Sequence, residues 1–255
     1  MRIGFISLRG LFLMGLITLV LAACTNKLIK KDSLIYSNDK DVVIIYANHN
    51  AWPGGSLPGQ ECNRIPNLRI WGDGHIVFSD VDNGSRRVLA GKISQEEIKG
   101  LFEMLDKMGF FNNPPPNSIN PAGTGYQIIV NLEKQKYQSF WSNETEIYAV
   151  LINSIEQEHL DIYTPEEGLL VVGPYKASAA IDAFPKWPQN ADFSLAEVGQ
   201  EGKWISGEIL LYVWEIINNQ PEPLTGIEEN GNIYAVGLEI RGISPEDPPY
   251  DCWNR

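Results

Sequence analysis

Short β-branched apolar runs alternate along the chain with longer segments of helical spacing. The run from Asp41 to Ala47 is apolar and β-branched, which predicts a buried strand. Residues 68–71 and 75–78 flank Gly72-Asp73-Gly74, and this pattern is typical of a β-hairpin because glycine readily adopts the positive φ of tight turns. Further strands are expected at 86–90, 126–132, 137–141, 169–172 and 233–240.

Two segments between residues 94 and 158 carry apolar residues at the spacing of an amphipathic helix. Residues 94–108 begin with Ser94 and have Glu97 three positions later, which is the pattern of a capping box. Gly109 is expected to end this helix. Residues 143–158 are expected to form the second helix, whose apolar face would consist of Ile147, Val150, Leu151 and Ile155.

The C-terminal part of the chain is less regular. Ser206 is expected to cap a third helix that extends through Asn218, and residues 174–204 are expected to be mostly loop. Strands joined mainly by hairpins, together with about three helices, indicate an α+β fold whose sheet is mostly antiparallel. This globular domain would comprise residues 41–255, either as one unit or as two subdomains that meet near 160–175.

The N-terminus carries the pattern of an export signal. Arg2 and Arg9 precede an apolar run that ends at Ala22. This run is shorter than the roughly 20 apolar residues that span a bilayer. It closes with Leu21-Ala22-Ala23-Cys24, which resembles the lipobox of bacterial lipoprotein precursors.

That resemblance implies a signal peptide at residues 1–23 and a lipid on Cys24. The protein would then be extracytoplasmic and anchored to a bacterial membrane, the outer one in a cell that has two. Residues 24–40 are polar and would form the lipidated tether. An ordinary secretory signal cut near Ala23 and a transmembrane anchor are the two alternatives.

The charge of the chain indicates which partners to expect, and its cysteines indicate a disulfide. The chain has 20 basic and 32 acidic residues, a formal net charge of −12, which disfavours nucleic acid because phosphate backbones require clustered Lys and Arg. The expected partners are the membrane, through the lipid on Cys24, and an envelope protein. Cys62 and Cys252 remain, and two thiols in an oxidising compartment predict a disulfide. The alternative is two buried, unpaired cysteines.

No catalytic, metal or cofactor motif emerges from the sequence. His49, His75 and His159 are scattered, so no metal site is predicted. Residues 54–58 depart from a nucleophile elbow because proline stands at the last glycine position. Asp73 beside His75 is the best candidate for a general base, but no nucleophile adjoins the pair.

Two functions are therefore compared. The favoured one is a non-catalytic, lipid-anchored envelope protein that binds a ligand or protein or assists envelope assembly. The alternative is an anchored hydrolase whose site assembles from distant residues, for example Asp73 and His75 with Ser56.

A second resemblance concerns the body of the chain. Residues 66–74, Gly109-Phe110-Phe111, Tyr163-Thr164-Pro165 and the closing strand before Cys252 are similar to segments of uncharacterised bacterial exported proteins. The similarity spans residues 60–252 and departs most at 174–204. It implies a fold and no activity.

Overall fold

The structure is a computed structural model. It describes residues 34–49, 65–82, 85–112, 125–141, 145–175, 183–199, 201–219, 225–241 and 243. Cys24, Ser56, Cys62 and Cys252 lie outside these ranges. Lipid attachment and the disulfide therefore stay predictions.

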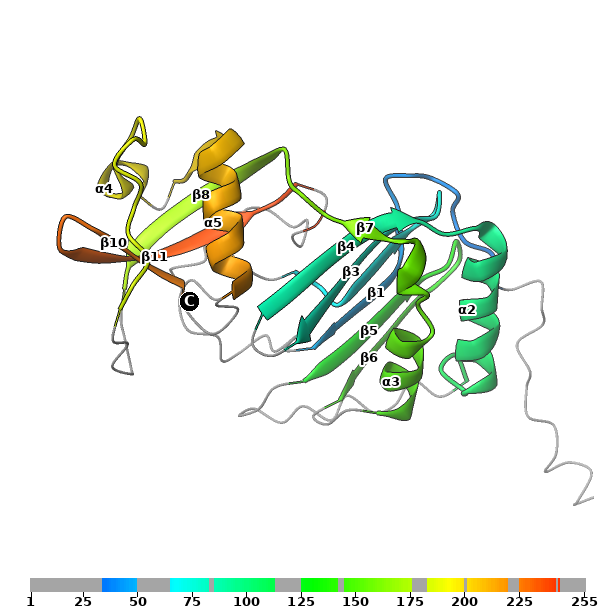
Figure 1. The fold of residues 1–255 in the computed structure, drawn as a ribbon. Coiled ribbons are helices and arrows are strands. Elements are labelled where there is room, and N and C mark those ends of the chain that lie inside the picture. The colour runs from blue at the N-terminus through cyan, green and yellow to red at the C-terminus, as the bar shows by residue number, and fades with distance from the viewer. Residues whose placement is uncertain are drawn as a thin grey trace, which may run out of the picture.

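An antiparallel sheet of seven strands, called here the large sheet, occupies the first part of the chain (Figure 1). Its strand order is β6-β5-β1-β2-β3-β4-β7. The strands are β1 Val43–His49, β2 Leu68–Trp71, β3 His75–Asp82, β4 Ser85–Lys92, β5 Tyr126–Asn131, β6 Lys136–Trp141 and β7 Asp161–Ile162. The predicted β2–β3 hairpin is confirmed, since Ile70 pairs with Ile76 across the turn.

A second antiparallel sheet of four strands, the small sheet, follows in the order β10-β11-β8-β9. Its strands are β8 Glu167–Pro174, β9 Lys203–Ser206, β10 Thr225–Glu229 and β11 Asn232–Glu239. Four α-helices accompany the two sheets in the described part of the chain: α2 Gln95–Lys107, α3 Glu146–Asn153, α4 Leu195–Val198 and α5 Gly207–Asn219, with a 3₁₀ turn, η3, at Gln157–His159. The expected α+β fold with antiparallel sheet is confirmed.

The capping box of α2 has the predicted geometry. The backbone N–H of Glu97 donates to Ser94 Oγ at 3.2 Å, and the backbone N–H of Ser94 donates to Glu97 Oε2 at 2.6 Å. These bonds satisfy two backbone donors that a helix start otherwise leaves unpaired. Hydrogen bonding of Ser94 to the Glu97 carboxylate, first through its side chain and then through its backbone N–H, lowers the pKa of the Glu97 carboxyl.

The expected length of the second helix was wrong. α3 is only eight residues long, because Thr145 caps it later than expected and Ser154 ends it. Most of its predicted apolar face is confirmed, since Leu151 and Ile155 are buried and Ile147 packs against the same core, together with Tyr148.

The segment expected to be mostly loop, 174–204, contains α4 and the first two residues of β9. The third helix lies where it was expected, because α5 begins directly after Ser206 and ends at Asn219. Ser206 is also the last residue of β9, and the φ of 64° at Gly207 allows the sharp turn from strand to helix.

Two apolar cores lie on opposite faces of the large sheet, because successive side chains of a strand point to opposite faces. The first core lies under α2 and α3 and includes Ile70 and Phe78 of the sheet and Phe102 of α2. The second core lies around α5, where Val77 and Val88 of the large sheet meet Leu210 of α5 and residues of the small sheet. Figure 1 shows α2 and α3 on one side of the large sheet and α5 near the small sheet.

The segment before β1 belongs to the folded body. Leu34 and Tyr36 pack against the first core, and the Tyr36 ring lies 4.9 Å from the Phe102 ring. The Tyr36 hydroxyl also hydrogen-bonds to Gln95 at 2.7 Å. The folded body therefore includes Leu34 and Tyr36, which lie inside the segment expected to be a tether.

Gly72 sits where this segment crosses the β2–β3 turn. A β-carbon at this position would collide with the backbone carbonyl oxygens of Ser37 and Asp39. The Gly72 N–H also donates to the carbonyl of Val42 at 2.9 Å. A side chain is thus excluded here by close backbone approach.

Candidate functional site

A cavity of about 560 Å³ lies at the β2–β3 end of the large sheet, where the chain segment after β11 returns to it. Its size falls within the roughly 300–1,000 Å³ range of small-molecule sites. Five parts of the chain line it: Lys40 and Asp41 before β1, Trp71, Asp73 and His75 around the hairpin turn, Lys92 at the end of β4, Tyr163 after β7, and Arg241 and Ile243 after β11.

Strand pairing explains why three of these side chains meet. His75 at the start of β3 lies opposite Lys92 at the end of β4, so both side chains stand at the same edge of the sheet. Trp71 ends β2 on the other side of the turn, and its ring centre lies 5.0 Å from that of His75. The indole is 5% exposed and so forms part of the cavity's apolar floor.

Asp73 stabilises the hairpin turn through its carboxylate. The backbone N–H of His75 donates to Asp73 Oδ1 at 3.0 Å, while Lys92 Nζ lies 3.4 Å from Oδ2. The hydrogen bond from the His75 backbone, assisted by Lys92, lowers the pKa of the Asp73 carboxyl. The sequence singled out Asp73 and His75 as the best general-base candidate, and in the structure the carboxylate contacts the backbone of His75 instead of its imidazole.

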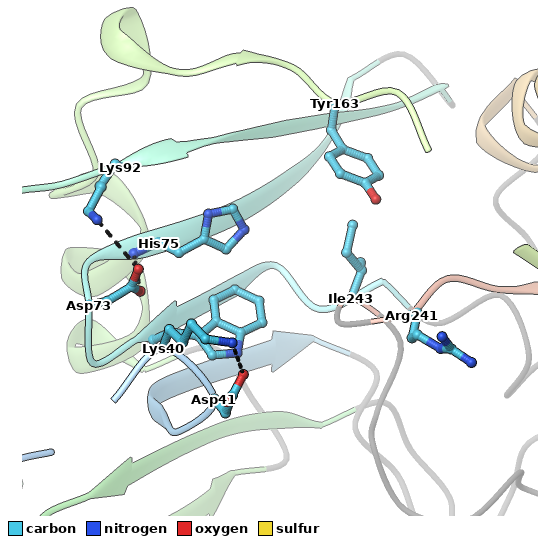
Figure 2. Close-up of a pocket in the computed structure, with 9 residues that line it drawn as sticks. Lys40, Asp41, Asp73, His75, Lys92, Tyr163, Arg241 and Ile243 are labelled. Carbon is cyan, nitrogen blue, oxygen red and sulfur yellow. Dashed lines mark hydrogen bonds and ion pairs between the residues drawn. The ribbon is translucent and has the colours of Figure 1, made fainter. Parts of the chain in front are cut away.

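Two side chains face the middle of the cavity with their polar groups unused. In Figure 2 the imidazole of His75 extends toward the side on which Tyr163 and Ile243 lie. Among the described residues, neither the His75 imidazole nor the Tyr163 hydroxyl has a hydrogen-bond partner. Burial, followed by the nearby charge of Glu166, raises the pKa of the Tyr163 phenol, so its hydroxyl stays protonated and can donate.

The charged side chains lie around the margin. Lys40 Nζ contacts Asp41 at 3.1 Å, and both side chains are largely exposed. Arg241 points away from the other labelled side chains in Figure 2, and it lies 3.5 Å from Glu167 and 4.9 Å from the Trp204 ring. The lining thus contains three basic and two acidic side chains, in a protein whose formal net charge is −12.

The remaining histidines lie elsewhere. His49 stacks on Tyr126 with ring centres 4.5 Å apart, and His159 lies 3.7 Å from Glu156 on the protein surface. Within the described ranges, no group of three His, Cys, Asp or Glu side chains is placed to hold a metal ion. The same ranges contain no helix with the length and apolar character needed to cross a membrane.

Most of the residues that line the cavity could not be predicted from the sequence. Lys92, Tyr163 and Ile243 carry no motif, and they converge only because β4, the segment after β7 and the segment after β11 meet in space. No family model, no curated protein and no solved structure matches the chain. The cavity is therefore interpreted from its own side chains.

Proposed function

We propose that the protein is a lipid-anchored binding protein of the bacterial envelope, attached through Cys24, and that it holds a ligand in this cavity without converting it. The observation that carries the proposal is the pair of polar groups on His75 and Tyr163 that line the cavity and have no hydrogen-bond partner among the residues that the structure describes. Small-molecule sites typically combine an apolar lining with a few such convergent polar groups.

The geometry favours binding over hydrolysis. In a catalytic triad the carboxylate receives a hydrogen bond from the imidazole, which fixes its orientation and tautomer. Here Asp73 instead accepts from the backbone N–H of His75. No serine, threonine or cysteine stands among the described residues that line the cavity.

The anchor part of the proposal rests on Leu21-Ala22-Ala23-Cys24 behind Arg2 and Arg9. Two or more acyl chains hold a protein stably on a bilayer, at about 0.8 kcal/mol per buried CH₂. Because Leu34 and Tyr36 pack against the first core, the tether would be shorter than the expected residues 24–40 and would end before Leu34.

Metabolic labelling with a fatty-acid probe tests the anchor. The wild-type protein should incorporate the probe and partition into the detergent phase. Cys24→Ser should abolish labelling and accumulate the unprocessed precursor, whereas Cys62→Ser, as the matched control, should leave labelling unchanged. Normal cleavage and labelling of Cys24→Ser would contradict the anchor.

An NMR screen of the mature chain, starting at Thr25, tests the cavity. The screen uses small anionic, neutral and cationic aromatic compounds together. Shift changes should concentrate on the Trp71 indole and on the backbone of His75 and Lys92. Changes confined to other surfaces, or chemical conversion of a compound, would contradict a non-catalytic binding site in this cavity.

A further inference from the structure

We infer that the cavity takes a small organic anion with an apolar portion, such as an aromatic carboxylate or phosphate ester. Its charged group would lie against His75, Tyr163 and Lys92. Its apolar portion would lie on Trp71 and Ile243. This inference rests on the proposed function, because it names the ligand class of the same cavity.

The polar groups at the centre match an anion. The Tyr163 hydroxyl is a neutral donor at physiological pH, since burial raises the pKa of its phenol. A neutral imidazole offers one N–H donor, and a protonated one offers two. The two side chains come from opposite sides of the cavity, His75 from β3 and Tyr163 from the segment after β7, so an anion between them can accept from both.

Lys92 can add a charge without disrupting the hairpin turn. Its 3.4 Å separation from Asp73 Oδ2 is longer than the roughly 2.7–2.9 Å of a strong charge-assisted hydrogen bond. The Lys92 side chain is 67% exposed, and its ammonium has three donors. Asp73 keeps its hydrogen bond from the His75 backbone if Lys92 turns toward a ligand.

The apolar surface explains why a bare inorganic ion is not the expected ligand. Trp71 is 5% exposed and Ile243 is 3% exposed, so both side chains are held in place by the surrounding structure. A cavity of about 560 Å³ exceeds what a single phosphate needs. An aromatic ring on the ligand would remove more apolar surface from water, at about 25 cal/mol per Å².

Titration of the mature chain with four probes tests the ligand class. Phenyl phosphate is the anionic probe, benzyl alcohol and benzylamine are the neutral and cationic counterparts, and inorganic phosphate lacks the ring. Phenyl phosphate should bind at least tenfold more tightly than each of the other three. Equal binding of the neutral or cationic aromatic probe would overturn the inference, as would equal binding of inorganic phosphate.

Two variants test whether phenyl phosphate binds in this cavity. Lys92→Gln and Tyr163→Phe should each weaken phenyl phosphate binding by about tenfold, the loss expected for one hydrogen bond to a charged group. Tyr163→Phe keeps the ring that contacts Trp214, so the fold is retained. Lys203→Gln is the matched control, because that lysine lies over the Phe193 ring and does not line the cavity.

The outcomes separate this inference from the proposed function. Shifts that concentrate on the cavity but show no preference for the anion, or no response to either variant, would overturn the ligand class and leave the binding site standing. If none of the probes shifts the cavity residues, both the ligand class and the binding site fail.

Discussion

The first core and the second core draw on different parts of the chain. All described members of the first core lie between Leu34 and Leu160, so one continuous segment supplies both the sheet face and the helices that cover it. The second core needs two segments, because α5 and the small sheet pack against the opposite face of the large sheet. The large-sheet region therefore carries its own core, whereas the small-sheet region depends on its neighbour.

Sheet geometry accounts for this asymmetry. A sheet has two faces, and α2 and α3 cover only one face of the large sheet. Trp71, Val77 and Val88 point to the other face and are at most 5% exposed. These side chains share the second core with α5, which contacts β4 of the large sheet and β8, β9 and β11 of the small sheet and so joins the two sheets.

Separating the two regions should give the largest effect. A fragment of residues 34–164 should unfold cooperatively in urea, at lower stability than the whole chain because its second face is exposed. A fragment of residues 165–255 should lack a cooperative transition, since it loses the apolar surface that α5 covers. Circular dichroism during urea titration measures both. Cooperative unfolding of the C-terminal fragment alone would refute the asymmetry.

Two core substitutions sharpen the comparison. Phe102→Ala should cost about 3–5 kcal/mol in the whole chain and a similar amount in fragment 34–164, because Phe102 is buried by that segment alone. Val77→Ala should cost about 1.5 kcal/mol in the whole chain, from the loss of two buried methylene equivalents. In the fragment its cost should nearly vanish, since α5 is missing. Equal costs of Val77→Ala in both proteins would contradict the shared second core.

The smallest expected effects concern the pH dependence of stability. One carboxyl beside the large sheet and one in the small sheet should change the stability in opposite directions as the pH rises. The Asp73 carboxyl has a pKa below its usual 3.8, so it stabilises the fold above that pH and loses this contribution as pH falls through its folded pKa. Glu239 of β11 has a pKa raised above 4.5 by burial, so the fold loses stability as pH rises from 4.5 through the folded pKa.

Asp73→Asn should therefore reduce the loss of stability in acid, and Glu239→Gln should remove a loss that develops toward neutral pH. Each change should stay within about 0.5 kcal/mol, as is usual for partly exposed positions. Urea midpoints measured across the acidic range would show the two opposite slopes. Slopes of the same sign would refute these assignments.

Local patterns were sufficient for the hairpin and for the start of α2. Gly72-Asp73-Gly74 specifies a turn by itself, and Ser94 with Glu97 specifies a helix start within four residues. The strand order could not be predicted in this way. β1 pairs with β2 on one side and with β5 on the other, and its partner in β5 is about 80 positions away in the chain, as in the pairing of Ile45 with Val130.

The residues that line the cavity could not be predicted from local patterns either. Asp73 and His75 stood out because they are neighbours in sequence, but the turn decides that the carboxylate bonds to the backbone. Tyr163 is placed by its backbone hydrogen bond to Val88 of β4, and Ile243 by the return of the chain after β11, so neither position follows from the sequence around His75. A site assembled from sequence-distant side chains leaves no spacing pattern that the sequence can reveal.

The close backbone contact at Gly72 would affect how far the folded body can lie from the membrane. While residues 34–40 stay docked, a lipid on Cys24 would be joined to the fold by the nine residues 25–33, which extend to about 30 Å at most. With the docked segment released, the connection would lengthen to residues 25–40 and about 55 Å. The absence of a side chain at Gly72 would thus limit how far the folded body can move from the bilayer that holds the lipid.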